Sequence, residues 1–238
     1  VNLGGEIVTD TRVTGLDETA GGWRIKSTFD VFETPYIVNA AGLHCDRVHQ
    51  LAGGHGSARI LPFRGEYYRL HPERQSLVRN LIYPVPDPSF PFLGVHFTRL
   101  IGGGVEAGPN AVLAFAREGY RKTDVNARDL FESLTFPGLW RFLKRYPQMC
   151  GHEFLQSLSK ARFCQSLQRL VPEITKDDLQ SGGTGVRAQA IDVDGTLLQD
   201  FSFGYGSHAL HLLNAPSPGA TASLAIGEAV MKEIAAQI

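Results

Sequence analysis

A few side chains in this sequence combine a reactive type with surroundings that suit a binding site. Arg187 stands in an apolar, strand-like segment, where a guanidinium needs a partner and a bidentate carboxylate is the natural one. That carboxylate belongs either to a bound ligand or to an internal salt bridge. Arg64 raises the same question, and the nearby Glu66 makes an internal pair a stronger competitor there.

Three further side chains lie in predicted strands or at their ends. His96 alternates with Val95 and Phe97, so it is either a base that titrates near neutral pH or a hydrogen-bonded core residue. Tyr83 and Asn110 follow strand-like runs, where each is as plausible a hydrogen-bonding group for a ligand as a structural one. The residue types alone leave both alternatives open.

The stretch 210–230 has the pattern of a strand, a tight loop and a helix. Leu210–Leu213 predicts the strand, and two prolines and a glycine between residues 214 and 219 exclude a helix there. A helical pattern begins near Thr221, with its apolar positions at Leu224, Ile226, Val230, Ile234 and Ile238. The first amides and the dipole of this helix suit a phosphate, a carboxylate or an electron-rich ring carbonyl, but a ligand-free connection fits equally well.

A second strand ends in small residues. Residues 36–42, Tyr-Ile-Val-Asn-Ala-Ala-Gly, predict a buried strand whose end would let a phosphate or ribose approach the backbone. Close packing of the next helix on this strand is the alternative. That helix is predicted over 43–52, with Val48 and Leu51 facing inward.

Composition and charge narrow the class of protein. The 238 residues include 23 Lys and Arg against 24 Asp and Glu, which gives no reason to propose nucleic-acid binding. Cys45, Cys150 and Cys164 have no metal-ligand spacing, so we predict no metal site and free thiols in a reducing compartment. No apolar run approaches the roughly 18 residues of a membrane span, and no signal peptide is visible.

The remaining elements fall into three groups. The first is β-rich, with short strands predicted over 6–9, 12–16, 23–28 and 30–34. The second is mostly antiparallel, with strands over 60–70 and 77–83, a proline-rich loop over 84–91 and a hairpin of 94–101 with 105–108. The third has helices over 124–136 (capped by Asp124), 137–146 and 152–171, and then strands over 185–190 and 197–203 joined by a turn at 192–196.

Seven segments of the chain, taken in order, resemble the L-2-hydroxyglutarate dehydrogenase and oxidase family, which belongs to the D-amino-acid-oxidase-like flavoproteins. They are PFRGEY at 62–67, NLIYPVPD at 80–87, PFLGVHFT at 91–98, GPNAVLAF at 108–115, REGYR at 117–121, GVRAQA at 185–190 and NAPSP at 214–218. The resemblance implies a mixed α/β fold, in which an FAD-binding α/β domain (1–58 and 185–238) is interleaved with an antiparallel-sheet and helix substrate domain (59–184).

The resemblance also implies an activity and a cofactor site. The flavin of FAD would take a hydride from C2 of L-2-hydroxyglutarate and yield 2-oxoglutarate; a related 2-hydroxy or amino acid is the alternative substrate. Val13 matches a position whose backbone meets the adenine, and Ala41 with Gly42 lies beside the nucleotide. The loop under the pyrimidine edge of the flavin matches Pro218, Gly219, Ala220 and Thr221, whose amides would stabilise negative charge on the reduced ring.

The substrate-binding positions follow from the same resemblance. Arg187 matches the position that grips the substrate carboxylate next to the flavin. We expect His96 to accept the hydroxyl proton, Arg64 or Tyr83 to hold the distal carboxylate, and Asn110 to add a hydrogen bond. Because a dicarboxylate needs two anchors, a cavity with Arg187 alone would count against this hypothesis.

One departure from the family pattern is large. Flavoproteins of this superfamily carry G-x-G-x-x-G after the first strand, and no such motif occurs in this sequence. We therefore expect the first β-α-β unit to be absent from the printed chain, and FAD binding by this chain alone to be weak or absent. A non-catalytic fragment completed by a partner is the competing hypothesis.

The expected partners are few. The substrate would be a small 2-hydroxy dicarboxylate, and an oligomer is compatible with the resemblance. The sequence leaves open whether oxygen or a membrane quinone reoxidises the flavin. The predicted location is the cytoplasm, with peripheral attachment to the inner membrane where a quinone is the acceptor.

Overall fold

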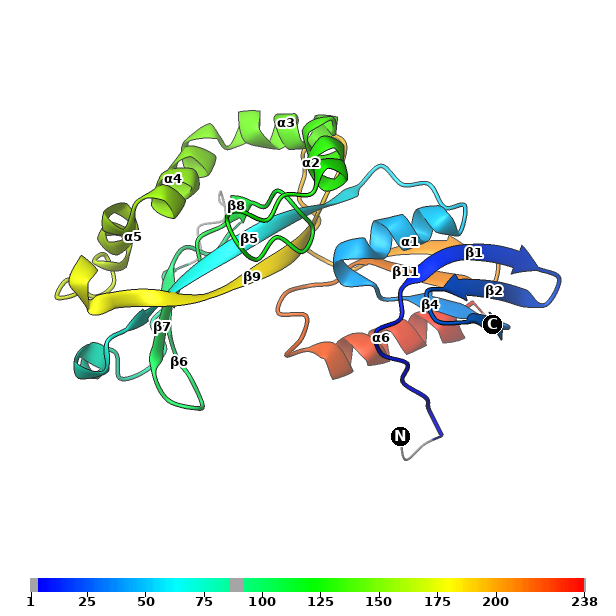
Figure 1. The fold of residues 1–238 in the computed structure, drawn as a ribbon, viewed down its shortest axis with the longest axis horizontal. Helices are drawn as coiled ribbons and strands as arrows, with labels where there is room; N and C mark the ends of the chain where they lie inside the picture. The colour runs from blue at the N-terminus through cyan, green and yellow to red at the C-terminus, as the bar shows by residue number, and fades with distance from the viewer. Residues whose placement is uncertain (1–3, 86–91, 238) are drawn as a thin grey trace. The chain divides into compact units, whose positions relative to one another are not determined.

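A computed structural model of the chain describes residues 4–85 and 92–237 (Figure 1). The chain forms two compact units: unit 1 consists of Val1–Ile60 and Leu198–Ile238, and unit 2 of Leu61–Leu197. The chain therefore leaves unit 1 once and returns to it for its last strands and helix. The predicted division, 1–58 with 185–238 against 59–184, differs in that residues 185–197 belong to unit 2, and the function assigned to each domain stays a prediction.

Unit 1 contains an antiparallel sheet of three short strands in the order β1-β2-β3. These are β1 (Val13–Thr19), β2 (Gly22–Ser27) and β3 (Val31–Thr34). The turn between β1 and β2 requires glycine, since Gly22 has φ +139° and a Cβ there would lie 2.2 Å from the carbonyl oxygen of Thr34. Trp23, next in the chain, is buried against Ile37 and Ala209.

The second sheet of unit 1 has the order β10-β11-β4. Its strands are β10 (Ser202–Gly206), β11 (Ala209–Asn214) and β4 (Ile37–Asn39). β11 pairs antiparallel with β10 and parallel with β4. The chain continues from β4 into η1 (Gly42–His44) and α1 (Cys45–Leu51), and from β11 into α6 (Ser223–Ala235). α6 packs through Val230 and Ile234 against Leu210 of β11.

Unit 2 is built on a sheet of five strands, in which β6-β7-β5-β8 lie in that order and β9 also pairs with β5. The strands are β5 (Arg59–Leu70), β6 (His96–Arg99), β7 (Val105–Gly108), β8 (Val112–Leu113) and β9 (Leu179–Ile191). β5 and β9 run side by side as the two long strands (Figure 1). Gly182 of β9 approaches β5 so closely that a Cβ would lie 2.5 Å from the carbonyl oxygen of Tyr67.

Four short helices lie between β8 and β9 in the sequence and complete unit 2. They are α2 (Ala127–Leu134), α3 (Pro137–Arg145), α4 (Pro147–Leu158) and α5 (Lys160–Leu167), with 3-10 turns η2 (Pro72–Leu77) and η3 (Lys176–Asp178). One core cluster includes Phe97, Phe163 and Leu167. A second includes Phe63 and Phe142, so helices and strands share both clusters.

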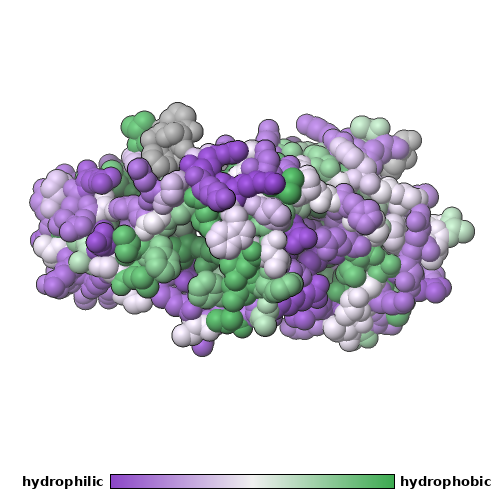
Figure 2. Space-filling view, turned by 90° about the horizontal axis from the view of Figure 1, so that it is seen from above, coloured by the Kyte–Doolittle hydropathy of each residue, from purple (hydrophilic) through white to green (hydrophobic). Residues whose placement is uncertain are grey.

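Large apolar side chains are exposed on α2, α3 and α4. Phe131 is 69% exposed, Trp140 50% and Leu158 65%. Figure 2 views the molecule from the side that these helices occupy in Figure 1, and it shows apolar surface between polar side chains. Within the described residues, no helix is both long and apolar enough to cross a membrane.

Several predicted elements are confirmed. The hairpin is present as β6 and β7, the helix predicted over 137–146 is α3, and residues 192–196 form a turn closed by a Gly195 N–H to Asp192 carbonyl hydrogen bond. The strand–loop–helix at 210–230 is also present as β11, residues 215–222 and α6.

Other predicted elements are wrong. Residues 6–9 form no strand. Residues 77–83 contribute only a bridge from Ile82 to Phe97, and residues 197–203 only a bridge at Leu197 before β10 begins. The helix predicted over 152–171 is two helices, because the Ser159 side chain accepts from the Arg162 amide and caps α5.

Three details of the helices also differ. Asn126 caps α2, whereas Asp124 accepts from the Arg121 amide one turn earlier. Leu51 is 41% exposed and Leu224 87% exposed, so neither faces a core. Most of the proline-rich loop, residues 86–91, and Ile238 lie outside the described residues.

Candidate functional site

Two of the predicted cofactor segments lie at one edge of the second sheet of unit 1. β4 and β11 are parallel, with Asn39 opposite His211. Their carboxyl ends therefore face the same way, and residues 40–42 and 215–221 both leave the sheet at that edge. In open α/β sheets, ligands bind outside the carboxyl ends of parallel strands.

The loop after β11 offers unused hydrogen-bond donors. Its Ser217–Pro218 peptide bond is cis, and the Ala222 amide donates to the carbonyl of Pro218 at 3.1 Å. Within the described chain, the amides of Gly219, Ala220 and Thr221 donate to no protein acceptor. These three residues are exposed just before α6, so their N–H groups are available to an anionic or electron-rich ligand.

The segment after β4 is held in an open conformation. The Ala41 amide donates to Oδ1 of Asn39 at 3.1 Å. Gly42 has φ +53°, and a Cβ there would meet nothing within 4 Å, so the backbone can be approached closely. Val13, the third predicted segment, begins β1 next to an irregularity in its pairing and is 37% exposed.

Arg187, in unit 2, has a guanidinium with no ion pair or hydrogen bond among the residues that the structure describes. It lies on β9 with Cζ 5.9 Å from the ring centroid of Phe92. The side chain is exposed, yet partial desolvation lowers its pKa from the ordinary value; an arginine stays charged all the same. Arg187 is thus an unneutralised cation that can accept a carboxylate.

His96 and Tyr83 form a stacked pair in unit 2. Their ring centroids are 4.2 Å apart with an angle of 16°. Nδ1 of His96 is 3.1 Å from the carbonyl oxygen of Gly94, so Nδ1 carries the proton, and Nε2 is an acceptor with no partner among the described residues. Desolvation lowers the pKa of His96, which keeps the ring neutral at pH 7. The Tyr83 hydroxyl is 3.4 Å from that of Thr98, and the residue is 47% exposed.

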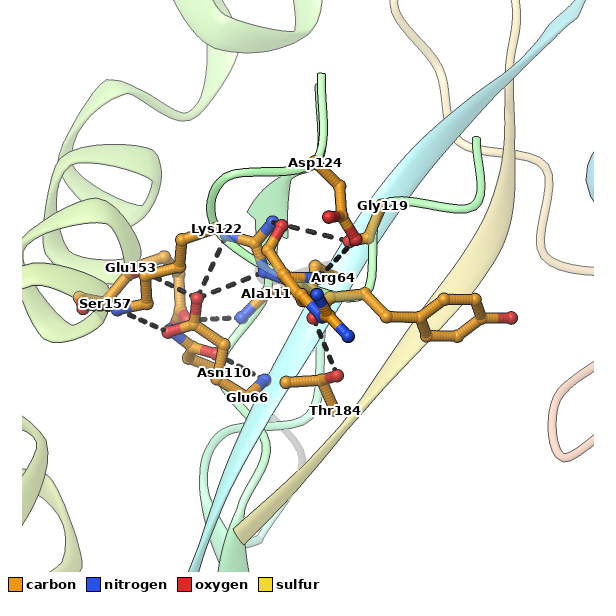
Figure 3. Close-up of polar contacts among 12 residues, drawn as sticks. Arg64, Glu66, Asn110, Ala111, Gly119, Lys122, Asp124, Glu153, Ser157 and Thr184 are labelled. Carbon is orange, nitrogen blue, oxygen red and sulfur yellow. Dashed lines mark hydrogen bonds and ion pairs between the residues drawn. The ribbon is translucent and has the colours of Figure 1, made fainter. Parts of the chain in front are cut away.

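Arg64 and Asn110 are committed to a buried network around Glu66 (Figure 3). Nε and Nη2 of Arg64 donate to Oε1 of Glu66 at 3.2 and 3.1 Å, and Nη1 donates to the carbonyls of Gly119 and Arg121. Asn110 accepts from the Glu66 amide at 2.8 Å and donates to its Oε2 at 3.3 Å. This geometry favours the internal pair that the sequence left open, and substrate binding by Arg64 or Asn110 loses its support.

The other members of this network were not predicted from the residue pattern. Ser157 of α4 donates to Oε1 of Glu66 at 3.0 Å, and Lys122 donates to the Ser157 carbonyl and pairs with Oε2 of Glu66. Glu153, one turn before Ser157, accepts from the Ala111 amide at 2.7 Å. Burial raises the pKa of Glu153 to about 7. Glu153 and Ser157 share a helix face at a spacing of four, but nothing in the sequence says what that face meets.

Comparison with known proteins gives a consistent assignment. Residues 1–233 match the family described as FAD dependent oxidoreductase (DAO). The chain is 48% identical to the L-2-hydroxyglutarate dehydrogenase of Indibacter alkaliphilus over 96% of this chain and 57% of that protein. It is 42% identical to the Escherichia coli K12 enzyme of that name, over 97% and 55% respectively. The chain thus spans about half the length of the curated relatives that it matches.

Solved structures show the same fold at low sequence identity. The L-alpha-glycerophosphate oxidase from Mycoplasma pneumoniae, with FAD bound, superposes with a TM-score of 0.60 at 17% identity, over 91% of this chain and 48% of that one. The glycerol-3-phosphate dehydrogenase from Bacillus halodurans gives 0.53 at 12% identity, over 95% and 39%. These likenesses support the predicted α/β fold class.

The donor set at the edge of unit 1 suits a flavin cofactor. The free amides of residues 219–221 match the electron-rich oxygens of a flavin ring, and the open backbone at Gly42 permits close approach of a nucleotide. The printed sequence offers no G-x-G-x-x-G for a pyrophosphate. From the family match over residues 1–233, the chain belongs to the DAO family of FAD-dependent oxidoreductases.

Proposed function

We propose that the chain is part of an FAD-dependent dehydrogenase that oxidises L-2-hydroxyglutarate to 2-oxoglutarate. The observation that carries the proposal is 42–49% identity to proteins named L-2-hydroxyglutarate dehydrogenase, across 84–98% of this chain. The predicted site motifs, from PFRGEY at 62–67 to NAPSP at 214–218, lie within the matched family region.

The cofactor would be held by residues of unit 1. We assign the pyrimidine edge of the flavin to Pro218 and the amides of 219–221, the nucleotide to Ala41 and Gly42, and the adenine to the backbone at Val13. When bound, FAD supplies the acceptor for the hydride that leaves C2 of the substrate. These N–H donors and the positive end of the α6 dipole would stabilise negative charge on the reduced ring.

The substrate would be held and deprotonated by residues of unit 2. Arg187 binds the carboxylate next to C2, because its guanidinium carries charge with no internal counter-ion among the described residues. Nε2 of His96 accepts the hydroxyl proton while C2 gives up its hydride, so the alcohol becomes a ketone. With Arg64 paired to Glu66, Tyr83 is the remaining candidate for the distal carboxylate.

A stopped-flow experiment tests the reaction. FAD-loaded protein mixed anaerobically with L-2-hydroxyglutarate should lose its flavin absorbance, and the D isomer should leave the absorbance unchanged. Equal response to both isomers, or to neither, would contradict the proposal. The His96→Gln variant should bind substrate normally but bleach about 10²–10⁴ times more slowly.

The electron acceptor and the cellular location are also part of the proposal. We infer a quinone as acceptor, in a cytoplasmic protein attached peripherally to the inner membrane, because relatives carry the name dehydrogenase and α2–α4 expose Phe131, Trp140 and Leu158. A soluble quinone should reoxidise the reduced enzyme much faster than air does. Sedimentation of the FAD-loaded protein would determine whether an oligomer forms.

A further inference from the structure

A buried asparagine lies directly behind the proposed nucleotide segment. Asn39, at the end of β4, is 5% exposed. Its Nδ2 donates to the carbonyl of Cys45 at 2.8 Å and contacts Nδ1 of His211 at 3.1 Å, while its Oδ1 accepts from the Ala41 amide. Because a carbonyl can only accept and an amide can only donate, the orientation of this carboxamide is fixed.

The fixed carboxamide determines the proton position on His211. Nδ2 of Asn39 presents a hydrogen, so Nδ1 of His211 must be the unprotonated nitrogen. The His211 ring is 1% exposed and lies 4.7 Å from the ring of His49, which is influenced in turn by Asp46 and His55. Desolvation and His49 lower the pKa of His211 to about 4, in agreement with a neutral ring.

We propose that His211 is a positioning residue for FAD binding. Its Nδ1 lone pair holds the carboxamide of Asn39, and that carboxamide holds the backbone at Ala41 and Gly42, where the nucleotide is placed. His211 itself is buried and touches no cofactor in this arrangement. The inference rests on the proposed placement of FAD at this edge, and the identity of the substrate does not affect it.

Three variants of the full chain test the role. His211→Asn keeps a neutral acceptor near the position of Nδ1, His211→Leu removes the acceptor, and His208→Asn makes the same change at an exposed histidine of unit 1. FAD affinity is measured by titration with FAD alone, and hydrogen exchange of the Ala41 amide is measured by NMR. Loss of the acceptor should weaken FAD binding about five- to tenfold and speed Ala41 exchange.

The pattern across the variants decides the proposal. We expect His211→Leu to show both effects, and His211→Asn and His208→Asn to show neither. Equal weakening in the two His211 variants, or an unchanged Ala41 exchange rate in His211→Leu, would overturn the proposal. Where FAD affinity is too low to titrate, the exchange rate decides alone. A chain that binds FAD but is not reduced by L-2-hydroxyglutarate would defeat the proposed function and leave this inference standing.

A fourth variant keeps the proposal testable if His211→Leu does not fold. Asn39→Asp retains an acceptor for the Ala41 amide but faces Nδ1 of His211 with a carboxylate oxygen. The carboxylate should raise the pKa of His211 above its value in the natural chain, as followed by NMR of the ring. An unchanged pKa would show that residue 39 and His211 are not in contact, which would overturn the proposal.

Discussion

Two arginines of unit 2 have opposite surroundings. Arg64 is 5% exposed and directs its guanidinium at Glu66 and at the carbonyls of Gly119 and Arg121. Arg187 is exposed, lies over Phe92, and has no hydrogen-bond or ion-pair partner in the described chain. Each was predicted to bind one carboxylate of the substrate. The donors of Arg64 serve the protein, whereas those of Arg187 remain available for a ligand.

Unit 1 repeats this contrast in its own residues. Asn39 uses its carboxamide fully inside the protein, on Ala41, Cys45 and His211. The amides of residues 219–221, at the same sheet edge, donate to no acceptor among the described residues. The donors of Asn39 therefore serve the scaffold, whereas those of residues 219–221 remain available to a ligand. Substitutions on the two sides should separate loss of stability from loss of ligand binding.

The largest effect is expected at the centre of the occupied network. Glu66→Ala leaves the buried guanidinium of Arg64 without its carboxylate, so the free energy of unfolding should fall by about 3–5 kcal/mol. Urea denaturation measures it. The matched control, Glu173→Ala at an exposed site of the same unit, should change stability by less than about 0.5 kcal/mol. A small loss in Glu66→Ala would contradict the assignment of Arg64 to the scaffold.

Much of the fold follows from local pattern. The glycine triplet at 102–104 and the alternation around it predict the β6–β7 hairpin, and the Pro-rich break at 214–219 predicts the end of β11. One error lies where a side chain acts on a neighbouring backbone, as Ser159 does at the start of α5. A helix period cannot reveal such a break, because apolar spacing continues across it.

Prediction of the site was limited in a different way. The free amides of 219–221 follow from the loop and helix pattern, since every helix start leaves donors unpaired. Which of the two arginines is paired inside the protein did not follow from the pattern, because this depends on contacts from distant segments. Gly119 and Ser157 belong to the Arg64–Glu66 network. Phe92 lies against Arg187. Sequence indicates which groups could bind, and tertiary contacts decide which of them are already used.

The next largest effect is expected at Arg187, the arginine with no partner among the described residues. In Arg187→Met, KM for L-2-hydroxyglutarate should rise about 10²-fold, because one charge-assisted anchor is lost. The free energy of unfolding should stay within about 0.5 kcal/mol of the natural chain, since no described residue pairs with this guanidinium. Steady-state kinetics of the FAD-loaded protein and urea denaturation together measure both. A fall in stability with an unchanged KM would reverse the roles of the two arginines.

Glu153, next to the network around Glu66, should make stability depend on pH. Burial raises the pKa of Glu153 from 4.5 to about 7, so between these values the folded chain holds a proton that the unfolded chain releases. The contribution of Glu153 to stability is therefore present below pH 4.5 and is lost as pH rises through 7. Glu153→Gln keeps an acceptor for the Ala111 amide and does not titrate. It should be about 2 kcal/mol more stable than the natural chain at pH 8 and equal to it at pH 4.

Denaturation curves at several pH values measure this difference. A Glu153→Gln variant whose advantage is the same at pH 4 and pH 8 would show that Glu153 does not titrate in this range. Gln156→Glu is unsuitable as a control because Gln156 is 2% exposed beside the network. Glu173→Gln, at the exposed site, is the suitable one and should leave the pH dependence unchanged.

The smallest effect is expected at Tyr83, the candidate for binding the distal carboxylate. Tyr83→Phe removes a hydroxyl but keeps the ring that stacks on His96 at 4.2 Å. If the phenol holds the distal carboxylate, KM should rise about tenfold, the value of one hydrogen bond to a charged group, while the pH profile of kcat is unchanged. Thr98→Val is the control, because it removes the 3.4 Å neighbour of the phenol and leaves the phenol in place. Equal KM values in the two variants would show that the phenol does not hold the distal carboxylate, and proton acceptance by His96 would then be the role left to this stacked pair.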